Sequence, residues 1–348
     1  MNAQDEIQYK MNVWRQNGAS GAAPYTNDEL EYKGAGTDWV KEMTRNASTQ
    51  AHAVAITGGS KRLKAATTLV YVDDNGILPN TSFNRLSGRL NIDYAVNDWL
   101  RAGVNGYMAR TKKTYLNMGT SASTDNVLYW MFMADPTRTM SDEGLNVFGK
   151  PDRKETVYFE IKNKDFRTDV NNAYLTFFAE ADLLPCLTAR AQYSYSYETD
   201  KYSKYYNRET LLGAGYKGKA EIEDEHVNYQ QLEGLLTFHK NFANRHDLKI
   251  IAGTSYQKND YEYMGMWAHG FTTDAFKYYN MGAASTIDAI ATARSVKKNL
   301  SFFTRAEYVL LDKYIINASL RADGASNFGA DNKWGYFPSV SLAWQLGD

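Results

Sequence analysis

The residues whose spacing could support chemistry are few, and the first candidate is a glycine-rich stretch. Gly213, Gly215 and Gly218, followed by Lys219, match the spacing G-x-G-x-x-G. That spacing binds a pyrophosphate only where a strand precedes it, a helix follows it and both belong to a parallel βαβ unit. The surrounding pattern places the stretch between antiparallel strands, so we interpret it as a flexible outer loop.

Metal ligands are also sparse. The chain has 5 histidines, none of them in an H-x-x-x-H pair, and a single cysteine, Cys186. His239 and His246 flank a short turn and could meet, but two imidazoles without a third ligand make a poor zinc site. One cysteine excludes an internal disulfide and a multi-cysteine metal site. We therefore expect no metal and no cofactor.

Residues for catalysis do not form a recognisable set. The sequence contains no G-x-S-x-G, and no Ser/His/Asp arrangement stands out. The carboxylate pair Glu221 and Glu223 lies in a charge run, which is typical of a solvated loop. We expect a protein that is not an enzyme.

Two aromatic clusters are the remaining candidates for binding. They are "NVLYWMFMADP" and "YEYMGMWAHGF", and we expect both in long outer loops. Aromatic rings there could stack on sugar rings or peptides, contact a partner protein, or simply pack within the loops. The candidate contact residues are Trp130, Phe132, Tyr263, Trp267 and Phe271.

The composition narrows the class of protein that must position these residues. The 348 residues carry a net charge of -1, and no run of Lys and Arg suits nucleic-acid binding. Aromatic residues make up 14%, with 26 Tyr, which favours pleated, half-buried surfaces. No run of about 18 apolar residues encodes a membrane-spanning helix. The opening "MNAQDEIQYKMNVW" has early acidic residues and no apolar centre, unlike a signal peptide.

Apolar and polar residues alternate along most of the chain with the period of a β-strand. Leu86, Leu90 and Ile92, for example, alternate with Arg89 and Asn91. The alternation predicts roughly ten or eleven strands of about 9–13 residues each. It covers residues 54–57, 65–72, 86–94, 100–108, 172–182, 187–198, 232–238, 248–256, 300–310, 314–322 and 339–346.

The connections between these strands alternate in length. Short ones are expected at 58–61, 96–98, 184–186, 241–245 and 311–313. Long ones are expected at 73–82, 112–167, 201–225, 259–295 and 324–333. Tight turns on one rim and long loops on the other are typical of a transmembrane β-barrel. A soluble sandwich also alternates, but its strands usually have about 5–6 residues, whereas a tilted strand crossing a bilayer needs about 9–11.

The barrel interpretation assigns the two faces of the sheet. Apolar side chains such as Leu90, Leu175 and Leu320 should lie on the convex side against lipid. Polar side chains should face a watery lumen, among them Arg89, Arg101, Arg190, Arg305, Arg321 and Asp323.

The last fifty residues carry a family resemblance. "NLSFFTRAEYVLLDKYIINASLRADGASNFGADNKWGYFPSVSLAWQLGD", with "TDWVKEMTRNASTQAHAVAITGGS" and "VYVDDNGILPNTSFNRLSGRLNIDYAVNDWL" earlier, resembles the barrel of SusC/RagA-family TonB-dependent outer-membrane transporters. The resemblance runs from about residue 37 to the end and implies location in the bacterial outer membrane. It implies import of oligosaccharide or peptide nutrients, a SusD-like surface lipoprotein as partner, and energy coupling by the TonB complex.

The resemblance also implies a 22-stranded barrel with an N-terminal plug, and this chain has about half of those strands. We therefore expect a barrel fragment without the plug and the C-terminal strands. Its fold should be all-β, an open antiparallel meander in residues 37–348, with residues 1–36 poorly structured or at the barrel edge. The alternative is a soluble or surface β-structured binding or adhesion module.

Overall fold

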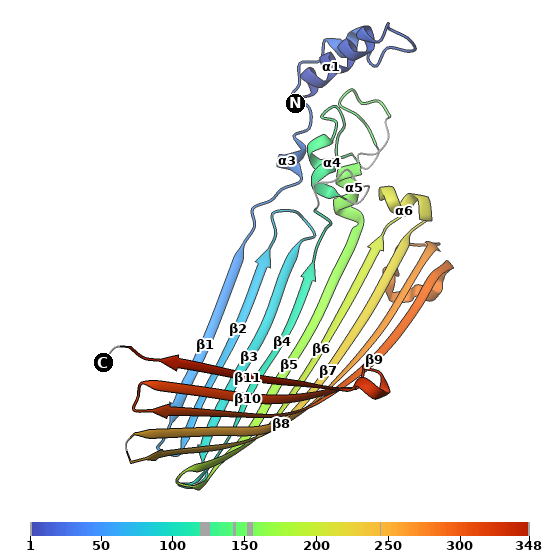
Figure 1. The fold of residues 1–348 in the computed structure, drawn as a ribbon. Helices are drawn as coiled ribbons and strands as arrows, with labels where there is room; N and C mark the ends of the chain where they lie inside the picture. The colour runs from blue at the N-terminus through green and yellow to red at the C-terminus, as the bar shows by residue number, and fades with distance from the viewer. Residues whose placement is uncertain (1, 119–125, 142–143, 152–155, 244, 347–348) are drawn as a thin grey trace.

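The structure is a computed structural model that describes residues 2–118, 126–141, 144–151, 156–243 and 245–346. Its main element is one antiparallel sheet of eleven strands, in which neighbours in the sequence are neighbours in the sheet (Figure 1). This arrangement confirms the expected meander. The strands are β1 (Thr49–Gly59), β2 (Leu63–Asn75), β3 (Ser82–Ala95), β4 (Leu100–Thr114), β5 (Lys164–Leu184), β6 (Leu187–Tyr206), β7 (Lys219–Phe242), β8 (His246–Phe271), β9 (Ala284–Leu310), β10 (Tyr314–Ala325) and β11 (Trp334–Trp344).

Helices occur only outside the sheet. They are α1 (Ala3–Gln16), α2 (Asn27–Leu30), α3 (Trp39–Glu42), α4 (Val127–Met133), α5 (Thr156–Asn163), α6 (Leu211–Tyr216), and the 3-10 helices η1 (Lys277–Ala283) and η2 (Ala330–Asn332). Residues 1–36 thus contain α1 and α2, and α1 buries Ala3, Ile7 and Met11. Within the described ranges no helix has the length and apolar character needed to cross a membrane.

The sheet is open. In the described chain β1 pairs only with β2 and β11 pairs only with β10, so the first and last strands are free edges. Figure 1 shows the sheet curling into a trough with these two strands at its borders. The expectation of an open sheet, with no pairing between the first hairpin and the last strand, is confirmed.

The two rims of the trough differ as the connection lengths predict. In a meander every second connection lies on the same rim, and the connections after β1, β3, β5, β7 and β9 have two to four residues. The other rim carries residues 76–81, 115–163, 207–218, 272–283 and 326–333. Helices α3 to α6 lie on that second rim, which we call the helical rim (Figure 1).

The expected strand length was wrong for the middle of the sheet. Strands β5 to β9 have 21, 20, 24, 26 and 27 residues. Towards the helical rim both faces of these strands carry polar side chains, so the alternation of apolar and polar residues stops although the strand continues. Consequently residues 201–206, 219–225, 259–271 and 284–295, which we expected in loops, belong to strands.

The register keeps apolar side chains on one face and charged side chains on the other. Phe302 lies opposite Thr254 and Ala322, whereas its neighbour Phe303 lies opposite Gly253 and Arg321. The row through Phe302 contains Ala102, Ala179, Ala191, Gly234, Thr254, Ala322 and Tyr336. The adjacent row contains Arg101, Glu180, Arg190, Leu235, Gly253, Arg321 and Phe337.

Exposure distinguishes the convex face from the concave face. Side chains converge on the concave side of a curved sheet and shield one another. On the polar face Ser255 and Ser301 are only 3% and 4% exposed, whereas Leu320 and Leu342 on the apolar face are 48% and 74% exposed. The apolar face is therefore the convex, outer one, which is the reverse of a soluble sandwich with an apolar interior.

The apolar face generates a paired test. Leu320→Arg places a charge in the middle of the outer apolar row of β10, and we expect it to destabilise the protein by about 2–4 kcal/mol in a bilayer. Ser319→Arg, one residue away on the concave face, should lower the free energy of unfolding much less. Urea titration of both variants folded into lipid vesicles measures the difference. Equal costs would contradict the assignment of the convex face to lipid.

Candidate functional site

The concave face of β6 to β8 carries a group of carboxylates and aromatic rings near the helical rim. In β7, Glu221, Glu223 and Glu225 occupy alternate positions and therefore share one face. The register places Asp200 opposite Glu225, and Glu225 opposite Tyr263. We call this group the tyrosine–carboxylate band; it consists of Glu198, Asp200, Glu223, Glu225, Tyr261, Tyr263 and Trp267.

Hydrogen bonds from phenols organise the band, but few cations neutralise it. The Tyr263 hydroxyl donates to Glu223 Oε2 at 3.1 Å. The Tyr174 hydroxyl donates to Glu198 Oε2 at 3.0 Å. Across the described residues Glu223 and Glu225 form no ion pair, in contrast to Glu221, whose carboxylate lies 2.7 Å from a lysine ammonium. The band is therefore negatively charged and rich in hydrogen-bond acceptors.

The side chains of Tyr263 and Trp267 pack closely over the backbone at Gly265. A Cβ atom at this glycine would lie 2.6 Å from the Tyr263 hydroxyl and would collide with the Trp267 indole. Only a glycine leaves room for both rings to fold over the strand. The result is an aromatic surface held between carboxylates on the same side of the sheet.

A recess of about 270 Å³ adjoins the band on the concave face. Val227, Asn259, Tyr261, Ser295 and Lys297 line it. The Asn259 side-chain oxygen is buried without a hydrogen-bond partner among the described residues. An aromatic ring beside an amide, a hydroxyl and an ammonium group can hold a polar ligand in a defined orientation, because the ring supplies contact area and the polar groups fix direction.

The structure separates the five aromatic residues predicted to contact a ligand or partner. We expected Tyr263 and Trp267 in a long outer loop. They lie instead in β8, on the concave face of the sheet. Phe271 ends β8 and is buried with Tyr205 and Tyr278 at the helical rim. Their placement in a loop was wrong because β8 continues past the end of the apolar alternation.

Trp130 and Phe132 lie in the long connection between β4 and β5, as expected, and both belong to α4. Trp130 packs against an apolar cluster at the helical rim that includes Trp39 and Val157. Phe132 is 69% exposed. Only Phe132 of this pair is therefore free to contact another molecule with most of its surface.

The six polar residues predicted for the lumen all share the concave face of the sheet. Arg101 and Arg190 both pair with Glu180, at 2.5 and 3.1 Å. Arg321 pairs with Asp323 at 2.8 Å. Arg305 contacts Glu307, and Arg89 lies 5.9 Å from the centre of the Tyr107 ring. These ion pairs lie nearer the short-turn rim than the tyrosine–carboxylate band does.

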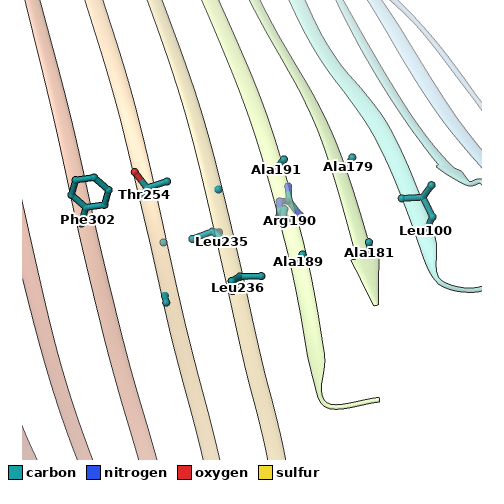
Figure 2. A pocket seen from close by; sticks show the side chains of 13 residues that line it. Leu100, Ala179, Ala181, Ala189, Arg190, Ala191, Leu235, Leu236, Thr254 and Phe302 are labelled. Carbon is teal, nitrogen blue, oxygen red and sulfur yellow. The ribbon is translucent and has the colours of Figure 1, made fainter. Parts of the chain in front are cut away.

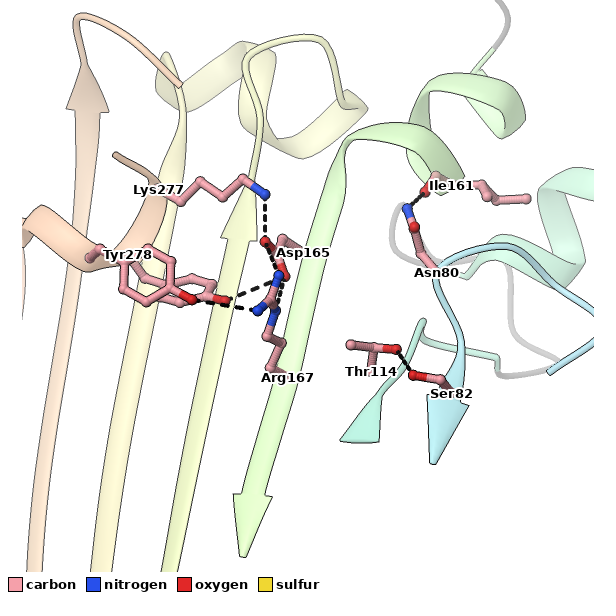
Figure 3. Close-up of polar contacts among 9 residues, drawn as sticks. Asn80, Ser82, Thr114, Ile161, Asp165, Arg167, Lys277 and Tyr278 are labelled. Carbon is pink, nitrogen blue, oxygen red and sulfur yellow. Dashed lines mark hydrogen bonds and ion pairs between the residues drawn. The ribbon is translucent and has the colours of Figure 1, made fainter. Parts of the chain in front are cut away.

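Polar contacts hold the segments at the helical rim in place. Asp165 accepts hydrogen bonds from Lys277 at 2.5 Å and from Arg167 at 2.8 Å, which holds η1 against the start of β5 (Figure 3). Farther from the sheet, Lys10 of α1 pairs with Asp135 at 2.5 Å, just after α4. Burial would raise the pKa of Asp135, but hydrogen bonds from Lys10 and Thr137 outweigh it and hold this pKa below its ordinary value of 3.8.

A second depression lies on the convex face and has different chemistry. It measures about 620 Å³ over β4 to β9, and Figure 2 shows small side chains such as Ala179, Ala189 and Ala191 along it. Phe302 and Leu236 border it. Because it interrupts the outer apolar face, it is a shallow part of that face rather than a polar binding site.

The other motifs singled out in the sequence have structural roles. Gly213 and Gly215 lie in the short helix α6, between the antiparallel strands β6 and β7, and not in a parallel βαβ unit. His239 contacts Asp247 at 3.1 Å, and His246 contacts the Tyr308 hydroxyl at 2.5 Å. Where the chain is described, no three His, Cys, Asp or Glu side chains are grouped to hold a metal ion.

Glu221 and Glu223, expected in a solvated loop, lie in β7. The missed signal was their spacing. Carboxylates at 221, 223 and 225 repeat with period two, as strand residues do. A carboxylate-rich face gives no contrast of hydropathy, so apolar alternation alone did not detect it.

Comparison with known proteins agrees with this architecture. Residues 105–348 match the model of the family described as TonB dependent receptor-like, beta-barrel. The chain is 26% identical over 324 residues to TonB-dependent receptor P3 of Formosa agariphila, covering 90% of this chain and 32% of that protein. It is 25% identical over 347 residues to TonB-dependent receptor SusC of Bacteroides thetaiotaomicron, again with 90% and 32% covered.

Solved structures share the fold. The RagAB peptide importer in the open-open state matches with a TM-score of 0.72 at 19% identity, covering 98% of this chain and 41% of that one. The chain spans about a third of the length of the curated relatives it matches.

The contact between α1 and Asp135 predicts a pH dependence. The lowered pKa means that the contact contributes stability above the ordinary pKa of 3.8, and that this contribution is lost as the pH falls through the lower folded-state value. We expect hydrogen exchange in α1 to accelerate below about pH 4 relative to Lys10→Met measured at the same pH. If the ratio of the α1 exchange rates in the wild type and in Lys10→Met stays constant down to pH 2, the ion pair does not hold α1.

Proposed function

Because the chain belongs to the TonB-dependent receptor-like β-barrel family, we propose that it forms part of the wall of a SusC/RagA-type outer-membrane transporter. The observation that supports this most is the arrangement of the sheet. One open, curved sheet carries a convex face that is apolar towards the short-turn rim and a concave face that is charged. The convex face would meet lipid, and the concave face would line the path of an imported nutrient.

The tyrosine–carboxylate band is the part of this path suited to contact the cargo. Tyrosine and tryptophan rings offer flat surfaces to sugar rings or peptide side chains, and carboxylates accept hydrogen bonds from hydroxyl or amino groups. Oligosaccharides and peptides both supply such groups. The negative charge of the band favours neutral or cationic cargo over anionic cargo.

Energy and capture would come from partners. In the proposed transporter the TonB complex drives import, and a SusD-like surface lipoprotein covers the helical rim. The exposed Phe132 of α4 is the strongest candidate contact for that lipoprotein, since Met133 beside it is also exposed and forms an apolar patch with it.

Two substitutions within the band test its role. Tyr261→Ala removes an aromatic surface at the recess, and we expect roughly tenfold weaker binding of the imported oligosaccharide or peptide. Glu225→Gln should increase binding of anionic analogues severalfold, because it removes one repelling charge. Isothermal titration calorimetry with neutral, cationic and sulfated ligands measures both effects.

The matched control is Glu262→Gln. Glu262 lies between Tyr261 and Tyr263 in β8 but on the convex face, where it pairs with Arg294 at 3.2 Å. It should leave binding unchanged. If Glu262→Gln alters binding as much as Glu225→Gln does, the concave face does not select the ligand.

The partner contact has its own test. Phe132→Asp places a charge in the exposed apolar patch, and we expect at least tenfold weaker association with the lipoprotein, as for an aromatic interface residue. Trp99→Asp, at an exposed aromatic residue of the opposite rim, is the control. Co-purification and a binding titration measure the effect. Unchanged association of Phe132→Asp would remove α4 from the interface.

A further inference from the structure

A groove on the convex face lies where the apolar surface ends towards the helical rim. It measures about 180 Å³ and spans β8 to β11 and the connection after β10. Tyr256, Leu300 and Trp334 provide its apolar part. Lys298 and Lys333 line the part nearer the helical rim. One end of the groove is therefore apolar and the other is cationic.

The apolar part is built by close packing of the rings. Tyr256 lies directly opposite Leu300 in the register. The Trp334 indole lies over Gly324, where a Cβ atom would be only 2.9 Å from the ring. It also stacks on Phe302 with ring centres 6.1 Å apart and an angle of 20° between the planes. These contacts place the Trp334 ring as one wall of the groove.

The cationic part is not neutralised by the protein. Lys298 and Lys333 are exposed, and within the described chain neither forms an ion pair. Lys258, directly opposite Lys298, differs because its ammonium group lies 3.3 Å from Asp260. Two lysines at one groove without a carboxylate partner leave a positive charge that an anion can satisfy.

The position of the groove indicates which kind of anion it would bind. On β8 and β9 the convex face changes from Tyr256 and Leu300 to Lys258 and Lys298 within two residues. In a membrane barrel this change marks the level at which acyl chains give way to headgroups, on the rim with long loops, which faces the cell exterior. A lipid phosphate at this level would meet the lysines while its acyl chain lies against Trp334.

We propose that this groove is a docking site for a phosphate-bearing lipid of the outer leaflet. Lys298 and Lys333 bind the phosphate, and Tyr256, Leu300 and Trp334 hold the first acyl segment. The inference rests on the proposed membrane placement of the convex face. It adds a specific lipid contact that general burial in a bilayer does not require.

The test uses the detergent-solubilised protein titrated with diphosphoryl lipid A and followed by native mass spectrometry. We expect about fivefold weaker binding for Lys298→Gln and for Lys333→Gln, and about twenty-fivefold for the double variant. Dephosphorylated lipid A should bind the wild type about as weakly as diphosphoryl lipid A binds the double variant. Trp334→Ala should weaken binding of both lipids.

The matched control is Lys112→Gln. Lys112 is an exposed lysine on the convex face near the same rim, but it lies opposite Asp169 and outside the groove. An equal loss for Lys112→Gln, equal binding of both forms of lipid A, or equally tight binding of inorganic phosphate would each overturn the proposal. If Leu320→Arg also costs nothing in vesicles, the membrane placement itself fails; if only the lipid titration fails, the groove alone is refuted.

Discussion

Strand pairing in an unbroken meander is the constraint on which the rest of the structure depends. The backbone N–H and C=O groups of an inner strand bond to the strands on either side of it, and in hydrocarbon an unsatisfied group costs several kcal/mol. Pairing also fixes the register, and a slip of one residue would exchange the two faces of a strand. The free edges of β1 and β11 present unpaired groups, which in a bilayer further strands, from this protein or another, would have to meet.

Most strand pairs keep one register from rim to rim, although the polarity of the two faces changes between the two rims. Near the short-turn rim the convex face is apolar and the concave face carries ion pairs such as that of Arg101 with Glu180. Towards the helical rim both faces carry polar side chains, while the strands and their pairing continue. Strands β7 to β9 are the longest and extend farthest beyond the apolar zone. The tyrosine–carboxylate band lies on the concave side of β6 to β8 in this extension, so the proposed recognition surface is built on paired strands rather than on loops.

This change in polarity along the strands explains which parts of the fold the sequence predicted and which it did not. Where one face is apolar, period-two alternation identified the strands, the short turns and the shared face of Arg89 and Arg321. Where both faces are polar, alternation gives no contrast, so the upper halves of β6 to β9 were interpreted as loops and Tyr263 was placed in one. The helical rim was beyond such a method, because contacts such as Trp39 Nε1 with the Asp135 carbonyl, 2.9 Å, join residues 96 apart in the chain.

A β-bulge between β8 and β9 marks one end of the tyrosine–carboxylate band. The pairing of β8 with β9 shifts between Trp267 and Ala268, and β9 gains one residue there. A bulge of this kind twists a strand and redirects its side chains. On the near side of the shift the rings of Tyr263 and Trp267 face the concavity. Beyond it Asp288 pairs with His269 at 2.7 Å, and Phe271 is buried against Tyr205. The bulge therefore ends the aromatic surface and begins the packed rim, so the proposed ligand-contact surface is confined to the regular part of β8.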